Sequence, residues 1–150
     1  MLEIILVAVD ASDQKCAVLH QAAEITRRFG ADLHVVSVFD LTQLREAKVP
    51  ESGPEIFESL EAENKKLLAE AQQQLDAWGI ASKGHFLRGS VIEQIASLAE
   101  RINADLVIMG HRYVSGLRRL LESSAAKGLI DKSPCSVMII REGKLVCDLL

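Results

Sequence analysis

A chain of 150 residues is long enough to bury one sizeable core, and 49% hydrophobic with only 4% aromatic residues predicts layers of aliphatic side chains rather than an aromatic-rich barrel. The net charge of −4 and the lack of a basic block argue against nucleic acid as a partner. The apolar run Ile4 to Val9 is too short to cross a membrane. We therefore expect one domain over residues 1–150, without a membrane partner and located in the cytoplasm.

Apolar runs predict five strands. The first, Ile4 to Val9, and the fourth, Leu106 to Met109, have no polar interruption, as expected of strands buried on both faces of a parallel sheet. The second strand, predicted at residues 33–39, and the fifth, predicted at residues 136–140, are also mostly apolar. The third strand, predicted at residues 83–87, is only weakly marked.

Between the strands, apolar residues recur at steps of three and four and predict four helices. The alternation of strands and helices predicts parallel βαβ units with right-handed crossovers. The first helix carries Val18, Ala22, Ile25 and Phe29 on one face and ends at Gly30. The others are expected from about residue 54 to 78, with Asn64 on the apolar face, from 91 to 102, and from 117 to 129.

The polar residues before the first helix and the three cysteines have structural interpretations. Asp10, Ser12 or Asp13 could each accept a hydrogen bond from the N–H groups at the helix start. The three cysteines are odd in number and lack the spacing of a metal site, which indicates reduced thiols. We expect Cys16 and Cys135 to be small core residues and Cys147 to be more exposed.

The loop after the fourth strand is the first place to expect a ligand. In open α/β sheets, ligands bind in the crevice at the carboxyl ends of the strands. A polar loop and the start of a helix follow Gly110, and the unpaired N–H groups of a helix start favour anions. The sequence therefore predicts that a small-molecule site, if present, includes this loop.

Several catalytic patterns are absent from the sequence. There is no Gly-Lys-Ser/Thr phosphate loop, no glycine-rich dinucleotide fingerprint after the first strand, and no Gly-x-Ser-x-Gly elbow. The four histidines do not have the spacing of a metal site. The third strand ends Leu87-Arg88-Gly89, without the acceptor aspartate of a receiver domain. We expect neither catalytic residues nor a bound metal.

Four segments, in order, resemble the universal stress protein family over essentially the whole chain. They are Val7-Ala8-Val9-Asp10-Ala11-Ser12, Gly30-Ala31-Asp32-Leu33, Ala104-Asp105-Leu106-Val107-Ile108-Met109-Gly110 and Pro134-Cys135-Ser136-Val137. The resemblance implies an α/β fold with an open five-stranded parallel sheet in the order 3-2-1-4-5 and helices on both faces. It also implies a homodimer formed through strand five.

One branch of this family binds ATP or another adenine nucleotide through a spaced glycine motif, and the other branch lacks it. On this chain the first motif position is Gly110, the second is Tyr113, and the third is Ser123, followed by Ser124. The tyrosine adds bulk where the family has none, whereas the serine hydroxyl could donate to a phosphate. Glu122, if it faced the site, would repel a triphosphate.

The resemblance also implies which residues contact a nucleotide. Asp10 looks like the acid near the adenosine, and Val38 and Met109 look like the residues that flank the base. Each has a structural alternative, since Asp10 could cap the first helix and the other two could belong to the core. The implied cofactor is ATP, with magnesium, or AMP, or none. The full set is Ala8, Val9, Asp10, Val38, Met109, Gly110, Arg112, Tyr113, Ser123, Ser124 and Ala125.

Two functions from different classes follow from the resemblance. The first is a regulatory homodimer that binds an adenine nucleotide and acts on an unknown protein partner. The second is a nucleotide-free interaction module with the same fold, favoured by Tyr113 and Ser123 in place of glycines. An ATP hydrolase ranks below both, because no general base or pair of metal-binding carboxylates is evident beyond Asp10.

Overall fold

The computed structural model describes residues 1–12, 14–40, 53–111 and 131–141. The expected helix at residues 117–129 lies outside these ranges, as do Asp13 and Cys147. Within them, strands and helices alternate up to β4. The elements are β1 (Ile4–Ala8), α1 (Lys15–Phe29), β2 (Asp32–Phe39), α3 (Gly53–Ala77), β3 (Ser82–Arg88), α4 (Val91–Arg101), β4 (Leu106–Gly110) and β5 (Ser136–Ile140).

The five strands form one parallel sheet in the order β3-β2-β1-β4-β5, which confirms the expected fold. Ile5 of β1 pairs with Leu33 of β2 on one side and with Leu106 of β4 on the other. Starting from β1, the chain first adds β2 and β3 on one side and then β4 and β5 on the other. The carboxyl ends of β1 and β4 therefore mark the switch point at which open α/β sheets bind ligands.

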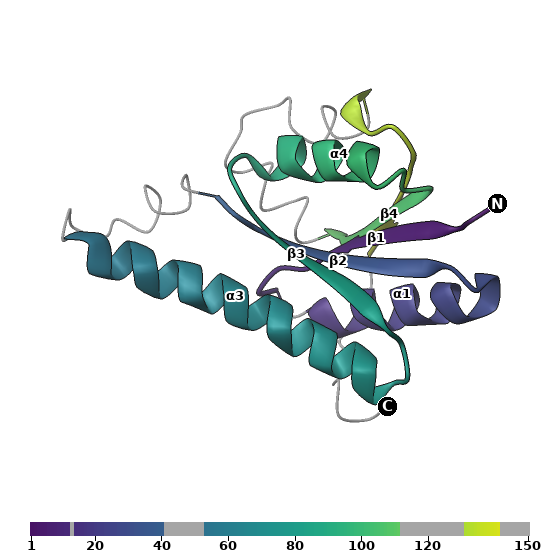
Figure 1. Cartoon of the computed structure of the whole chain (residues 1–150), viewed down its shortest axis with the longest axis horizontal. Helices are drawn as coiled ribbons and strands as arrows, with labels where there is room; N and C mark the ends of the chain where they lie inside the picture. Colours follow the sequence, from purple (N-terminus) through teal and green to yellow (C-terminus); the bar gives the residue numbers. More distant parts are fainter. Residues whose placement is uncertain (13, 41–52, 112–130, 142–150) are drawn as a thin grey trace.

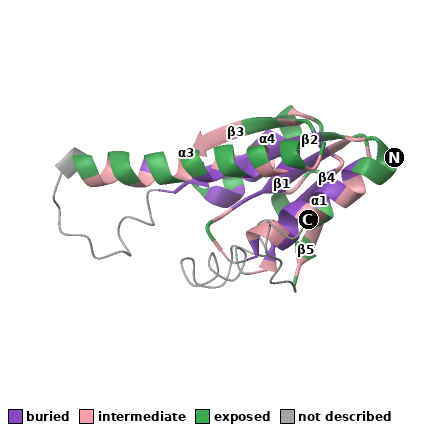
Figure 2. Ribbon diagram, turned by 90° about the horizontal axis from the view of Figure 1, so that it is seen from below, coloured by how far each residue is buried: buried purple, intermediate pink, exposed green. Residues whose placement is uncertain are grey.

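Helices cover both faces of the sheet. Figure 1 shows α4 on one face, and α1 and α3 on the other. Side chains alternate along each strand, so successive residues enter different cores: Leu6 packs with Ile95 of α4, whereas Val7 packs with Leu19 of α1 and Leu75 of α3. Burial on both faces explains why the central strands have uninterrupted apolar sequences, and these strands are buried along most of their length in Figure 2.

The buried stripe of α1 differs from the predicted one. Val18 and Ala22 are buried as predicted, but Phe29 is 56% exposed, and Leu19, Ala23 and Thr26 are buried in addition. The stripe is rotated by about one residue, because tertiary packing and not the apolar period alone fixes the angle of a helix about its axis. Gly30 ends the helix as predicted, with a φ of 63°.

The predicted caps of α1 are also not formed among the described residues. Gln14 is the N-cap and makes no side-chain cap bond, and Asp10 Oδ1 accepts the N–H of Ser12 at 3.1 Å within the preceding turn. The cysteine prediction is partly wrong, because Cys16 is disulfide-bonded, whereas Cys135 is a free, half-buried thiol. No helix in the described part of the chain is long and apolar enough to span a bilayer.

Candidate functional site

A cavity of about 440 Å³ opens at the carboxyl edge of the sheet, where β1 and β2 end beside the first half of α3. Strand ends supply one wall, and α3 supplies the other. Its lining consists of Val9, Asp10, Ala11, Lys15, Val38, Leu60, Glu63, Asn64, Lys66, Leu67 and Glu70. The volume is typical of small-molecule pockets, which span about 300–1,000 Å³.

Three of the predicted site residues line this cavity. Val9 and Val38 lie at the carboxyl ends of two neighbouring strands and are 2% and 3% exposed, and Asp10 is the second residue after β1. Their adjacency follows from the parallel pairing of β1 with β2, because Val9 N–H donates to the carbonyl of Val36 at 3.0 Å and extends the ladder by one residue. The alternative that Asp10 caps α1 is not what the structure shows.

The other described residues of the predicted set do not line the cavity. Ala8 is 2% exposed, and Met109 is fully buried in the core beneath α4, as the core alternative predicted for Met109. Gly110 is the last residue of β4 and is also buried. The remaining predicted residues lie outside the described ranges: Arg112, Tyr113, Ser123, Ser124 and Ala125.

Gly110 has a packing role that the motif did not indicate. A Cβ at this position would lie 3.1 Å from Oε1 of Gln14 and 3.3 Å from Cγ2 of Val18. Both distances are shorter than ordinary van der Waals contact, so the start of α1 approaches the end of β4 as closely as a glycine allows. Gln14 is held there by its Nε2 group, which donates to the carbonyl of Arg141 at 3.1 Å.

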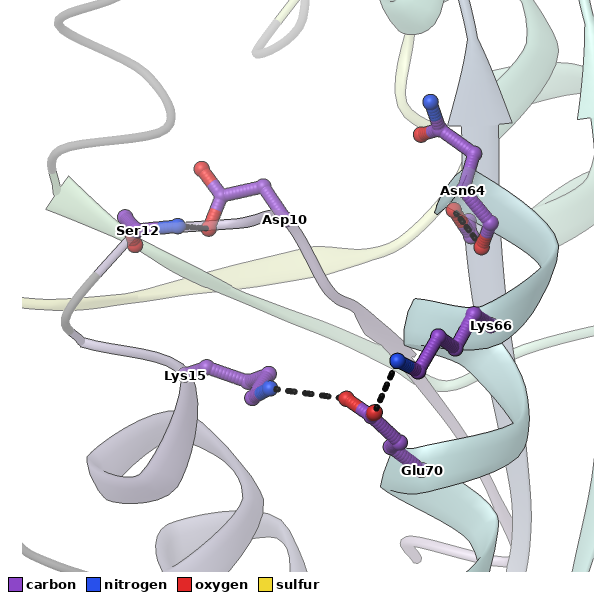
Figure 3. Close-up of polar contacts among 7 residues, drawn as sticks. Asp10, Ser12, Lys15, Asn64, Lys66 and Glu70 are labelled. Atoms are coloured by element: carbon purple, nitrogen blue, oxygen red, sulfur yellow. Dashed lines mark hydrogen bonds and ion pairs between the residues drawn. The ribbon is translucent and has the colours of Figure 1, made fainter. Parts of the chain in front are cut away.

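The cavity carries hydrogen-bonding groups on both walls. Oδ1 of Asp10 accepts the Ser12 N–H, and its second oxygen accepts no bond from the described residues. Across the cavity, Asn64 donates from Nδ2 to the carbonyl of Leu60 at 3.0 Å, which leaves its side-chain oxygen as an acceptor. The backbone carbonyl of Asn64 accepts the Ser37 hydroxyl at 3.4 Å, tying α3 to β2 (Figure 3).

Charged side chains lie along one side of the cavity. In Figure 3, Lys15 from α1 and Lys66 from α3 both reach Glu70, with N–O distances of 3.8 and 3.9 Å. The three side chains are 26%, 76% and 48% exposed, respectively, so these pairs add little to stability. Their relevance is that they line the same cavity as Asp10 and therefore contribute to its charge.

Sequence reasoning did not identify the contribution of α3 to this site. The available signal was Asn64, a polar residue on the otherwise apolar face of the predicted helix. Lys15, Lys66 and Glu70 gave no such signal, since charged residues on an amphipathic helix are usually only solvated. Among the described residues there is no cluster of three or more potential metal-binding side chains.

Comparison with known proteins agrees with this architecture. The chain is 27% identical to universal stress protein MJ0531 of Methanocaldococcus jannaschii over 93% of its own length and 82% of that protein. A universal stress family protein from Burkholderia pseudomallei superimposes with a TM-score of 0.70 at 26% identity, covering 93% of this chain and 96% of the other. The universal stress protein of Archaeoglobus fulgidus, solved in complex with dAMP, gives 0.63 at 26% identity, covering 93% and 99%.

The family assignment rests on nearly the whole chain. The universal stress protein family model matches residues 1–141, a range that contains every described element from β1 to β5. The strand order and the two helical layers are those that the resemblance implied. This chain therefore belongs to the universal stress protein family.

Proposed function

We propose that this protein is a regulatory homodimer that binds an adenine nucleotide, with the nucleoside in the cavity at the carboxyl ends of β1 and β2. The observation that carries the proposal is the carboxylate of Asp10, which lines the cavity together with Val9 and Val38 and has one oxygen free of described partners. A relative of similar fold, the Archaeoglobus fulgidus protein, was solved with dAMP.

The cavity walls match the two parts of a nucleoside. A purine base needs apolar neighbours, and the lining contains Val9 and Val38 at the strand ends and Leu60 and Leu67 on α3. A ribose needs hydrogen-bond acceptors for its hydroxyl groups, and the second oxygen of Asp10 is such an acceptor.

The charge of the cavity favours a monophosphate over a triphosphate. Its lining contains the carboxylates Asp10, Glu63 and Glu70 against the ammonium groups Lys15 and Lys66, which leaves one net negative charge. Additional phosphate groups would be repelled from this lining. The phosphate itself would be held by the loop after β4, where Ser123 and Ser124 are the predicted donors, and magnesium would be needed only with ATP.

We expect regulation to follow from nucleotide binding at the loop after β4 and not from catalytic turnover of the nucleotide. A nucleotide that binds one conformation of the protein more tightly shifts the population toward that conformation and changes the surface offered to a partner. The homodimer contact would use β5, the edge strand beside β4.

The nucleotide-free interaction module is the second candidate. It is favoured by the packing of Gly110 against Gln14 and Val18, because a glycine required for packing is not evidence of a phosphate site. Under this alternative, neither AMP nor ATP binds the purified protein.

Replacing Asp10 by asparagine tests the assignment. Asp10→Asn keeps the size of the side chain but removes its charge. We expect AMP binding to weaken roughly 10- to 150-fold, as for loss of a hydrogen bond to a charged group. The matched control is Asp76→Asn, an exposed carboxylate of α3 outside the cavity, which should leave the affinity unchanged.

Isothermal titration with AMP and 2′,3′-dideoxy-AMP separates ribose recognition from general charge effects. The wild type should discriminate between the two ligands, and Asp10→Asn should lose most of that discrimination. Equal affinity losses for both ligands, or an unchanged affinity for AMP, would contradict the placement of the ribose at Asp10.

A further inference from the structure

Asn64 is the one uncharged polar residue that α3 contributes to the described lining of the cavity proposed for the nucleoside. It lies four residues after Leu60 and three before Leu67, so the three side chains share one face of the helix. The hydroxyl of Ser37 donates to the carbonyl of Asn64 at 3.4 Å, which places Asn64 beside the carboxyl end of β2. In Figure 3, its side-chain amide extends from α3 toward the side on which Asp10 lies.

The orientation of the Asn64 amide is fixed by one hydrogen bond. Its Nδ2 lies 3.0 Å from the carbonyl oxygen of Leu60, and because a carbonyl only accepts, the amide atom at this distance must be the nitrogen. The side-chain oxygen is therefore directed away from that carbonyl. It accepts no hydrogen bond from the described residues, and it is not buried. A ligand in the cavity can therefore reach an acceptor whose direction is already set.

The stability of α3 does not explain an asparagine at this position. In a helix interior, asparagine is a weaker helix former than leucine. Its bond to the carbonyl one turn earlier offers the backbone an alternative to the helical ladder. On a helix face that also carries Leu60 and Leu67, a leucine would be favoured both by propensity and by burial. A role in ligand recognition accounts for the polar side chain.

We propose that Asn64 determines the base specificity of the site by accepting a hydrogen bond from the 6-amino group of adenine. This inference rests on the proposed function, which places the ribose at Asp10. Because Asp10 follows β1 and Asn64 lies beside β2, a base attached to that ribose extends across the strand ends toward α3. The 6-amino group is the only N–H donor of the adenine base in a nucleotide, so it is the group that a side-chain acceptor can bind.

Calorimetric titration of the nucleotide-stripped full chain with AMP and with purine riboside 5′-monophosphate tests the assignment. The second ligand differs from AMP only in lacking the 6-amino group. We expect the wild type to bind AMP about three- to tenfold more tightly than the second ligand, the effect of one neutral hydrogen bond. In Asn64→Leu this ratio of affinities should fall to about one, because leucine offers no acceptor.

Two further variants separate recognition of the base from packing. Asn64→Asp keeps an acceptor at this position and should keep the ratio, although its added negative charge weakens the binding of both ligands. Gln73→Leu makes the same change from an amide to leucine at an exposed position of α3 outside the cavity, and it should leave both affinities unchanged. The Tm of ligand-free Asn64→Leu should not fall, because leucine is the better helix former.

Failure of this assignment and failure of the proposed function give different results. If AMP binds the wild type and binds Asp10→Asn more weakly, but the ratio of affinities is the same in the wild type and in Asn64→Leu, the role of Asn64 is overturned and the nucleotide site stands. A ratio of about one in the wild type would overturn it as well. If the wild type does not bind AMP, the proposed function fails, and the role of Asn64 fails with it.

Discussion

The substitution Gly110→Ala tests whether this glycine serves packing. The new Cβ would lie 3.1 Å from Gln14 Oε1 and 3.3 Å from Val18 Cγ2. The valine is fixed on a helix, and the glutamine is 4% exposed and bonded to the carbonyl of Arg141, so neither moves freely. Overpacking of this kind costs about 1–3 kcal/mol. For a chain of this length, the Tm should fall by about 2–12 °C.

Urea unfolding in a double-mutant cycle provides the assay. In a Gln14→Ala background the shorter contact is removed, so Gly110→Ala should cost less than half of what it costs in the wild type. The m-value should stay constant in all four proteins. An unchanged stability of Gly110→Ala, or the same cost in both backgrounds, would refute the packing argument and return Gly110 to a purely ligand-binding role.

Three further predictions concern the core and the pH dependence of stability. Leu75→Ala, at a fully buried site of α3, should lower the free energy of unfolding by about 2–5 kcal/mol in urea titrations, and a smaller loss would mean that the core closes around the gap. His34 Nδ1 and His85 Nε2 lie 2.8 Å apart, and the pKa of both side chains is lowered, first by burial and then by neighbouring positive charge. The contribution of the pair to stability is therefore present above about pH 6.5 and lost on acidification. In His34→Gln, the urea midpoint should depend less on pH between pH 8 and 5 than it does in the wild type. Asp105 accepts hydrogen bonds from two backbone N–H groups at the start of β1, which lower the pKa of its carboxyl group. Its contribution to stability is therefore present above about pH 4 and lost in acid. The urea midpoints of wild type and Asp105→Asn should converge as the pH falls through that pKa, and a constant difference between them would contradict this.

Local sequence patterns predicted most strands and helices of the described chain. The runs around Val7 and Ile108 are buried on both faces, so their hydrophobicity is continuous and easily recognised. The edge strand β3 was weakly marked because Phe86 and Leu87 are its only large apolar residues, and polar residues such as Lys83 and His85 make up most of the rest. The strand order came from the family resemblance, since periodicity locates strands but does not specify which strands pair.

The candidate site was predictable only where it follows strand ends. The resemblance indicated Val9, Asp10 and Val38, which do line one cavity, whereas Met109 and Ala8 belong to the same buried cluster as Val38 but do not line the cavity. The wall of the cavity that α3 forms could not be predicted from the sequence, because the approach of α3 to β2 depends on how the helix packs against the sheet. The contact of Gly110 with α1 was not predicted for the same reason, and Gly110 was interpreted only as a position of the nucleotide motif.

Calorimetric titration of nucleotide-stripped protein with AMP, with ATP as the comparison, tests whether the protein binds an adenine nucleotide. We expect saturable binding of one AMP per chain and weaker binding of ATP, because the cavity lining carries a net negative charge. Absence of binding for both nucleotides would contradict the nucleotide-binding function and favour the interaction module of the same fold.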